Sequence, residues 1–285
     1  MAEKVLTEIQ EIERSIIKTY RSKLWSPFIK ALKDYEMLKP GDHVCVCISG
    51  GKDSMLLAKL FQELKKHSDF EFDVSYILMN PGYNEKNLNL IKFNLDKLGI
   101  PAEIIDTDIF DIANNAGGKP CYLCARMRRG ALYGIAEKKG CNKIALGHHL
   151  DDVIETTLMS ILNNGIVQTM LPKLHSDNFE GMELIRPLYL IREKDIKNWA
   201  RRFDLNFIRC ACRFTELTED DLLVSKRKET KEIIHELELK NPLIVKNLFM
   251  CTSNINMDKI LGYRKSGELH SYLEYYDDIT DDKNE

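Results

Sequence analysis

The sequence predicts an α/β fold, in which a parallel sheet carries helices on both faces and helical segments are added at both ends of the chain. Between residues 43 and 208, short apolar runs rich in β-branched residues alternate with longer segments of helical periodicity. A glycine-rich turn follows the first run and an acidic turn follows a later one, at the strand ends where such sheets bind ligands. The length of 285 residues, with 44% hydrophobic and 30% charged residues, fits an ordinary globular protein.

The first 40 residues are expected to form a helical segment that precedes the sheet. Apolar residues recur at helical spacing within residues 3–20. A second helix is expected to begin at Ser26, because serine caps helices and Pro27 suits the first helical position. A turn at Lys39–Asp42 separates this segment from the first strand.

The central segment, residues 41–215, is expected to contain the sheet and the helices that cover it. The expected strands are His43–Ile48, Phe72–Met79, Ala102–Asp106, Lys143–Gly147, Leu184–Ile185 and Asn206–Ile208. The expected helices are Lys52–Lys66, Glu85–Leu98, Cys124–Lys139, Asp151–Asn163 and Lys194–Phe203. Residues 111–120, which include several Gly and Asn, are expected to form a loop.

The last part of the chain divides into two further segments. Residues 216–275 are expected to be helical, on the periodicity of Leu222–Leu239 and Pro242–Met250. Residues 276–285 are acidic and offer little to bury, so they are expected to be a disordered tail.

Composition also bounds the location and the partners. The longest apolar run, Val44–Ile48, is far shorter than the roughly 18 residues of a membrane helix, so no membrane is expected. The chain begins with an expected amphipathic helix rather than a signal peptide, which predicts a cytoplasmic, reducing location. The net charge of −3 argues against nonspecific binding of nucleic acid by the whole surface, but it permits a local basic patch.

The strongest motif joins the first expected strand to the next helix. It reads Ser49, Gly50, Gly51, Lys52, Asp53 and Ser54. Paired glycines let the backbone approach a ligand, the amides of the turn and helix start suit an anion, and Lys52 adds a positive charge. A Walker A loop is excluded, because it needs glycine where Val46 stands and Ser or Thr where Asp53 stands. The motif predicts a phosphate-binding loop of a different kind.

An acidic turn follows a later strand of the same expected sheet. It begins Gly147-His148-His149-Leu150 and continues with Asp151 and Asp152. Two carboxylates at a strand end can hold Mg²⁺, which prefers oxygen ligands and bridges phosphates. The alternative is the capped start of a helix.

Two pairs of cysteines form the third motif. Cys121 and Cys124 are spaced as CxxC, and Cys210 and Cys212 follow at a distance. From spacing alone, structural zinc, an iron–sulfur cluster and a redox dithiol all stay open. The other cysteines placed by the sequence, Cys45, Cys47 and Cys141, are expected to be buried as small apolar residues.

Together these motifs resemble the tRNA 2-thiocytidine synthetase family, the iron–sulfur tRNA thiolases of the PP-loop ATPases. The resemblance covers residues 45–212 and rests on SGGKDS at 49–54, the CxxC at 121–124 with Arg126–Gly130, Lys143–Asp152, Ile185–Leu188 and Arg192–Ile196. It implies the PP-loop fold of the adenine nucleotide alpha-hydrolases. It also implies an enzyme that cleaves ATP between the α and β phosphates, adenylates the C2 oxygen of an anticodon-loop cytidine and replaces that oxygen with sulfur.

The resemblance also implies roles for individual residues. ATP would be bound by Ser49, Gly50, Gly51, Lys52, Asp53, Ser54, Gly147 and His148. Catalysis would depend on Lys52, Asp53 and Asp152, the two aspartates holding Mg²⁺. A 4Fe–4S cluster with one open iron would be held by Cys121, Cys124 and Cys210, with Cys212 as the alternative third ligand, since the family has a second CxxC where this chain has Cys-Ala-Cys. Zinc is the alternative metal.

The implied partners are tRNA and a sulfur donor, either a cysteine desulfurase or free sulfide, and a homodimer is left open. Sulfur would be carried by the open iron or by a cysteine persulfide. Arg126, Arg128 and Arg129 are candidates for contacts with tRNA phosphates, the alternative being a solvated helix face. Three other functions are kept as alternatives: a lysidine synthetase-like ligase, a thiolase of a different base, and a noncatalytic metal–sulfur module.

Overall fold

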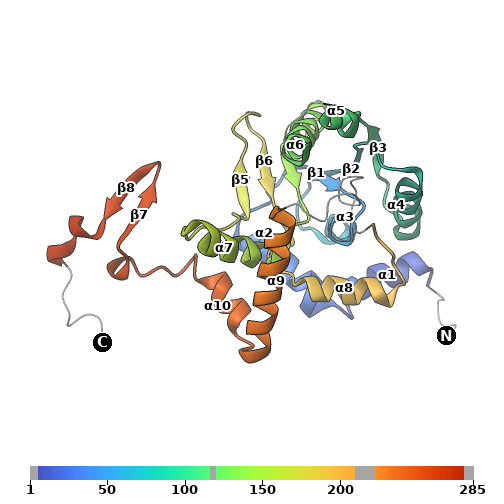
Figure 1. Cartoon of the computed structure of the whole chain (residues 1–285). Helices are drawn as coiled ribbons and strands as arrows, with labels where there is room; N and C mark the ends of the chain where they lie inside the picture. The colour runs from blue at the N-terminus through green and yellow to red at the C-terminus, as the bar shows by residue number, and fades with distance from the viewer. Residues whose placement is uncertain (1–5, 116–119, 209–221, 279–285) are drawn as a thin grey trace.

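The computed structural model describes residues 6–115, 120–208 and 222–278. At its centre lies a six-stranded sheet in the order β3-β2-β1-β4-β6-β5 (Figure 1). The strands are β1 (His43–Ile48), β2 (Asp73–Asn80), β3 (Glu103–Asp106), β4 (Lys143–Ala145), β5 (Lys173–His175) and β6 (Glu183–Ile185). All neighbours pair in parallel except β5, which pairs antiparallel with β6. The predicted α/β class is confirmed, and the five parallel strands are those expected up to Ile185.

Helices cover both faces of this sheet. The α-helices of the described part of the chain are α1 (Glu8–Ile17), α2 (Ser26–Asp34), α3 (Lys52–His67), α4 (Glu85–Leu98), α5 (Ile109–Asn115), α6 (Pro120–Lys138), α7 (Leu150–Asn164), α8 (Glu193–Arg202), α9 (Leu222–Lys240) and α10 (Ile244–Met250). Figure 1 shows α5 and α6 on one face, and α3 with α1 and α8 beyond it on the other. The expected two-sided cover is confirmed.

Strand β1 lies in the middle of the sheet and is buried on both faces, which is why it reads as a continuous apolar run. Its side chains alternate between the faces. Val44, Val46 and Ile48 belong to the main core, which includes α3, whereas Cys45 and Cys47 belong to a second cluster under α6. The predicted burial of Cys45, Cys47 and Cys141 is confirmed.

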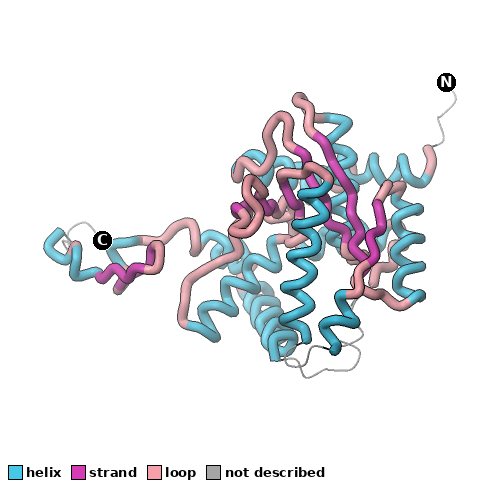
Figure 2. The backbone as a smooth tube through the Cα atoms, turned by 90° about the horizontal axis from the view of Figure 1, so that it is seen from above, coloured by secondary structure: helices cyan, strands magenta, loops and turns pink. Residues whose placement is uncertain are grey.

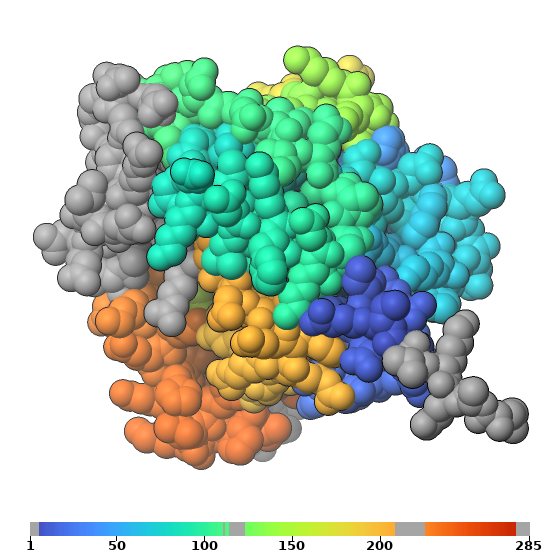
Figure 3. All heavy atoms as spheres, turned by 90° about the vertical axis from the view of Figure 1, so that its right-hand side faces the viewer, coloured from blue at the N-terminus to red at the C-terminus, as the bar shows by residue number. Residues whose placement is uncertain are grey.

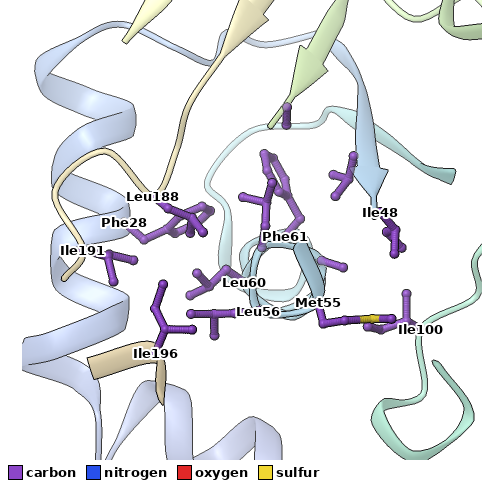
Figure 4. Close-up of a cluster of buried hydrophobic side chains, with 14 of the residues drawn as sticks. Phe28, Ile48, Met55, Leu56, Leu60, Phe61, Ile100, Leu188, Ile191 and Ile196 are labelled. Atoms are coloured by element: carbon purple, nitrogen blue, oxygen red, sulfur yellow. The ribbon is translucent and has the colours of Figure 1, made fainter. Parts of the chain in front are cut away.

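Helix α3 is the most enclosed helix of the core, and its burial fixes the turn from which it starts. Figure 4 shows Leu56 and Leu60 directed toward Ile191 and Ile196, while Met55 extends toward Ile100. Each such side chain, fully buried, contributes about 1.5–3 kcal/mol. The first turn of α3 is therefore held in place by packing further along the helix.

On one side of the molecule, α1 (dark blue), α4 (teal) and α8 (gold) meet at the surface (Figure 3). Lys97 of α4 connects them, because its ammonium group lies 3.3 Å from Glu8 Oε1 and donates to the carbonyl of Phe203 at 3.0 Å. The N-terminal helical segment thus packs directly on the sheet domain.

Two local predictions near the sheet were wrong. Residues 109–115 form helix α5 where a loop was expected from residue 111, because Ile109, Phe110 and Ala113 are buried and this packing outweighs the helix-breaking tendency of the asparagines. Asn206–Ile208 is not a strand. The carbonyl of Asn206 accepts a hydrogen bond from Asn94 Nδ2 at 2.7 Å, which ties this segment to α4 instead of the sheet.

Two elements near the N-terminus and the sheet edge also differ from expectation. Helix α2 begins at Ser26 as predicted, but it continues from a π-helical turn over Arg21–Trp25, so Ser26 does not cap it. Strand β5 was not predicted, because Lys173–His175 is short, polar and mostly exposed at the edge of the sheet.

The C-terminal segment was expected to be helical throughout, and this was only partly right. Helices α9 and α10 pack against α7 through Ile154, Ile234 and Val245. Beyond them, β7 (Gly262–Lys265) and β8 (Glu268–Ser271) form an antiparallel hairpin that projects from the body of the molecule (Figure 2). The expected disorder of the tail concerns residues that, from 279 on, lie outside the described part of the chain. The division at residues 40 and 215 stays a prediction.

Candidate functional site

The glycine-rich turn between β1 and α3 is braced by its own hydroxyl groups. The amide of Ser49 donates to Ser54 Oγ at 3.1 Å, and the Ser54 hydroxyl donates to the carbonyl of Gly51 at 2.9 Å. Gly51 is the N-cap residue of α3 and has no side chain to cap the helix. The first amides of α3 therefore remain suited to an external anion.

Gly50 is required in this turn for two reasons. Its φ of 82° lies in the left-handed region, and a Cβ would lie 2.6 Å from Ile91 Cγ1 and 3.0 Å from Ile208 Cδ1. The same turn is held from the other side by the Tyr83 hydroxyl, which donates to the carbonyl of Ser49 at 3.2 Å. The turn is therefore enclosed by α4, by the segment at Ile208 and by Tyr83.

The acidic turn after β4 packs directly on the first turn of α3. A Cβ on Gly147 would lie 3.1 Å from the backbone of Asp53 and Ser54, so any larger residue would require the two turns to move apart. His149 then caps α7: the amide of Asp152 donates to His149 Nδ1 at 3.3 Å, and the amide of His149 donates to Asp152 Oδ2 at 3.0 Å. The structure brings the two predicted motifs together.

His149 lies between the carboxylates of both motifs. Its Nε2 is 3.8 Å from Asp53 Oδ1 and its Nδ1 is 3.3 Å from Asp152 Oδ2. Asp53 Oδ1 is buried and accepts no hydrogen bond within the described residues. A buried carboxylate oxygen without a donor is costly, which makes it a suitable ligand for a cation. The sequence did not single out His149 for this position.

His148, the neighbouring residue, presents a neutral ring. Burial, together with the nearby cations Arg186 and Arg227, lowers the pKa of His148 to about 4 against the opposing effect of Asp152. Its Nδ1 is buried with no hydrogen-bond partner in the described part of the chain. At neutral pH this histidine can form a hydrogen bond to a ligand but carries no charge.

A cavity of about 350 Å³ opens in front of the phosphate loop. Its lining is almost entirely charged: Lys52, Asp53, His149, Asp152, Glu155, Glu193, Arg227, Lys228 and Lys231. The residues come from the starts of α3, α7 and α8 and from α9. Such a site selects a polar, charged ligand and not an apolar one.

Ion pairs cross this cavity between its walls. Lys52 Nζ lies 3.0 Å from Asp53 Oδ2 and 3.0 Å from Glu193 Oε1. Burial opposes the charge on Lys52, but the two carboxylates outweigh it and raise its pKa. Burial likewise opposes the charge on Glu193, but Lys231, Lys197 and Lys52 hold the pKa of this carboxyl well below its usual range. Lys52 and Glu193 are thus both charged at neutral pH.

The opposite wall, α9, pairs with the remaining carboxylates. Arg227 Nε lies 3.2 Å from Glu155 Oε2, and its Nη2 lies 3.6 Å from Asp152 Oδ1. Lys231 Nζ lies 2.6 Å from Glu193 Oε2 and 3.9 Å from Glu155 Oε1. Burial raises the pKa of Glu155 in spite of Lys231 and Arg227.

The cysteine motif begins α6, close to the phosphate loop. Cys124 is partly buried against the main core. Burial raises the pKa of Tyr83, Arg128 lowers it and Cys124 raises it, so both side chains act on the hydroxyl that binds the carbonyl of Ser49. The side chain of Cys121, and Cys210 and Cys212, lie outside the described residues.

The three predicted arginines do not share one environment. Arg126 and Arg129 are exposed, and Arg128 is half-buried. Against the opposing effect of burial, the charge of Arg128 lowers the pKa of Tyr83. The charge of Arg129 instead lowers the pKa of Tyr133, which belongs to the second core cluster. Of the three, Arg128 is the one whose charge affects Tyr83, which donates to the carbonyl of Ser49.

Comparison with known proteins agrees with this geometry. The PP-loop domain family matches residues 21–212. A tRNA-cytidine(32) 2-sulfurtransferase of Coxiella burnetii is 38% identical over 241 residues, which cover 82% of this chain and 90% of that protein. The chain belongs to the PP-loop family, in the branch of these sulfurtransferases. A relative of the same name from Legionella pneumophila is 36% identical over 239 residues, covering 81% of each chain.

A solved tRNA thiolase structure has the same fold. The U34-tRNA thiolase NcsA from Methanococcus maripaludis, determined with its [4Fe-4S] cluster, superimposes with a TM-score of 0.61 at 24% identity, over 90% of this chain and 87% of that one. Within the described residues, no helix is both long and apolar enough to cross a membrane. The predicted family and fold are confirmed.

Sequence reasoning missed the part of the cavity that lies outside the two loop motifs. Glu193 stands in the segment Arg192–Ile196, which contributed to the family resemblance without being given a role. Glu155, Arg227 and Lys231 are ordinary helix-surface residues by pattern, and α9 lies beyond the matched PP-loop domain. The only sequence signal was that Arg227 and Lys231 are four residues apart, on one helix face.

Proposed function

We propose that this protein is an ATP-dependent tRNA sulfurtransferase that replaces the C2 oxygen of an anticodon-loop cytidine with sulfur. The observation that carries the proposal is that Cys124, in the cysteine-bearing helix α6, packs against the core that includes Tyr83, whose hydroxyl binds the phosphate loop at Ser49. Relatives over most of the chain bear the name tRNA-cytidine(32) 2-sulfurtransferase, which supports both the reaction and the base.

The phosphate loop would bind the triphosphate of ATP. Its amides, the hydroxyls of Ser49 and Ser54, and the ammonium group of Lys52 supply donors at the positively polarised start of α3. Gly50, Gly51 and Gly147 let the ligand and the two turns approach closely. His148, neutral at pH 7, would donate or accept a hydrogen bond beside the nucleotide.

Asp53 and Asp152 would hold Mg²⁺. The buried Asp53 Oδ1 without a hydrogen-bond donor fits this role. Mg²⁺ prefers oxygen ligands, and phosphate oxygens of the nucleotide would complete its coordination. When bound, Mg²⁺ would offset charge on the departing pyrophosphate.

Cys121, Cys124 and one of Cys210 and Cys212 would hold a 4Fe–4S cluster, with zinc as the alternative metal. Cys121 and Cys124 stand three apart within the first turns of α6, and Ile208, two residues before Cys210 in the sequence, contacts the phosphate loop at Gly50. The thiolate donors suit iron–sulfur chemistry, and the NcsA structure contains such a cluster. When bound, the cluster would supply an open iron site for the sulfur atom.

The reaction would proceed in two displacements. The C2 oxygen of cytidine attacks the α-phosphorus of ATP, the bond to the bridging oxygen breaks, and pyrophosphate leaves. A hydrosulfide sulfur then bonds to C2, the C2–O bond breaks, AMP leaves with the former carbonyl oxygen, and the sulfur loses its proton to solvent. Lys52 and the loop amides would stabilise the charge that develops on pyrophosphate.

The target base must leave its stack to reach the loop, which suits a single-stranded anticodon loop. Arg128, close to Tyr83, would contact the tRNA near the site, and Arg126 and Arg129 would contact phosphates at its exposed rim. We also propose that a cysteine desulfurase or free sulfide supplies the sulfur atom. Assembly of the protein as a homodimer is part of the same proposal.

The test is an anaerobic assay of purified protein with ATP, sulfide and unmodified tRNA. We expect bound iron and sulfide, and 2-thiocytidine by mass spectrometry of the digested tRNA. Cys124→Ala should lose both the cluster and the product, whereas Cys251→Ala, outside the motif, should keep both. Stoichiometric zinc without iron, or a modified base other than cytidine, would contradict the proposal. If both Cys210→Ala and Cys212→Ala lose the cluster, it has four protein ligands and no open iron.

A further inference from the structure

Helix α9 forms the wall of the cavity that faces the phosphate loop, although it lies outside the matched PP-loop domain at residues 21–212. Its residues Arg227 and Lys231 are four apart and therefore lie on one face of the helix. Both side chains are about half exposed, at 47% and 49%, so a ligand in the cavity can reach them.

A single carboxylate is shared between this wall and the loop. Glu193 Oε1 binds Lys52 and Glu193 Oε2 binds Lys231, so the two ammonium groups flank one anionic group in front of the start of α3. A phosphate group is also an anion with several oxygen acceptors, and cations arranged around a carboxylate can bind it in the same way.

We propose that Arg227 and Lys231 bind the β and γ phosphates of ATP, and that Glu193 holds Lys231 and Lys52 in place until the nucleotide arrives. This inference rests on the proposed use of ATP and adds two phosphate ligands from the C-terminal segment. Glu193 occupies the two ammonium groups while no nucleotide is bound and competes with phosphate for them.

Glu193 keeps a cationic partner during the exchange. When Lys52 and Lys231 turn to phosphate, Glu193 keeps Lys197, whose ammonium group is 2.9 Å from Oε2. When Arg227 turns away from Asp152, this carboxylate faces the Mg²⁺ that it is proposed to hold. An ion pair broken without such replacement would cost several kcal/mol.

Helix α9 can change these partners without moving, because it is fixed one to two turns further on. Arg192 binds Glu238 with two hydrogen bonds of 3.0 and 2.9 Å and binds Asp151 at 3.1 Å. Ile234, which is buried, packs against α7 and α10. The residues that would meet phosphate are therefore on a rigid element.

The test compares the affinities for ATP and AMP, measured by calorimetry, because AMP lacks the β and γ phosphates. Arg227→Gln and Lys231→Gln should each lower the affinity for ATP about tenfold, which corresponds to the loss of one charge-assisted hydrogen bond. The affinity for AMP should not change. Glu193→Gln removes the anion that competes with phosphate for Lys52 and Lys231, so it should raise the affinity for ATP several-fold. Lys240→Ala, an exposed lysine at the far end of α9, is the matched control and should change neither affinity.

The other outcomes separate this inference from the proposed function. If Lys52→Ala lowers the affinity for ATP but Arg227→Gln and Lys231→Gln do not, the α9 side chains do not bind phosphate. In that case only the inference fails. If the two variants bind ATP and AMP with equally reduced affinity, the substitutions act through the fold and not through phosphate contacts. This result would also overturn the inference. If the unaltered protein binds no ATP, the proposed function fails with it.

Discussion

Lys52 and Lys59 lie on the same helix, about two turns apart, and each binds a glutamate from another element. Lys59 is fully buried, and its ammonium group donates to Glu13 Oε1 and to the carbonyl of Leu98, both at 2.9 Å. Lys52 binds Glu193 and Asp53 at 3.0 Å but faces the cavity and stays 23% exposed. The chemistry of the two pairs is the same, and their surroundings differ.

The pKa shifts of the two lysines run in opposite directions for this reason. Burial lowers the pKa of Lys59 more than Glu13 raises it. Around Lys52 the two carboxylates outweigh burial and its pKa is raised. A lysine enclosed by core residues serves the fold, whereas a charged lysine on a cavity can exchange its carboxylate for a ligand. The two ion pairs have the same residue types, so what separates them is access to the cavity.

The largest effect is expected from Lys52→Ala. Loss of a donor to the developing pyrophosphate charge should lower kcat/KM for tRNA thiolation by about 10³-fold. The free energy of unfolding should change by less than about 1 kcal/mol, because Glu193 keeps Lys197 and Lys231. Steady-state kinetics and urea denaturation give the two values. A loss of stability comparable to that of Lys59→Ala would remove the distinction between the two sites.

Lys59→Ala should have the opposite profile. Removing one partner of a buried pair leaves Glu13 and the carbonyl of Leu98 without this donor and should lower the free energy of unfolding by about 3 kcal/mol. Activity per folded molecule should be unchanged. The matched control is Lys66→Ala on the same helix: Lys66 also binds Glu13 but is 48% exposed, and it should cost less than about 1 kcal/mol. Equal costs for the two variants would contradict the account.

The exposure of Arg192, which pairs with Glu238, lies between that of Lys59 and that of Lys52. Of the three substitutions, the one in this pair is expected to have the smallest effect. Hydrogen bonds from Arg192 and Lys194 lower the pKa of Glu238 from its ordinary 4.5 to about 2. The unfolded chain binds this proton first, so the pair stabilises the fold above about pH 4.5 and loses its contribution as the pH falls to about 2. Glu238→Gln should cost about 1 kcal/mol at pH 7 and nothing near pH 2. A cost that does not change with pH, in urea denaturation curves, would show that the charge is not involved.

Local patterns made much of this structure predictable. The strand, the glycine turn and the helix from His43 to Lys66 follow each other within one continuous segment, so periodicity and turn chemistry define them. The pairing of β1 with β4 brings Asp152 beside the phosphate loop through Gly147.

The rest depends on contacts between distant segments. Glu193, Arg227 and Lys231 look like solvated helix residues until α8 and α9 are placed around one cavity. The segment at Asn206 has the composition of a strand, but the side chain of Asn94, 112 residues earlier, takes its carbonyl. Strand β5 carries no signal of its own and forms only because β6 offers it an edge.

The central claim is that the loop at Ser49–Ser54 serves cleavage of ATP at its α-phosphorus. The direct measurement follows ATP labelled at the α-phosphate, incubated anaerobically with the protein, sulfide and unmodified tRNA. The account predicts labelled AMP and pyrophosphate, formed only with tRNA and in equal amount to 2-thiocytidine, and abolished by Asp53→Ala or Asp152→Ala. Formation of ADP and phosphate, or full AMP release by both variants, would contradict it.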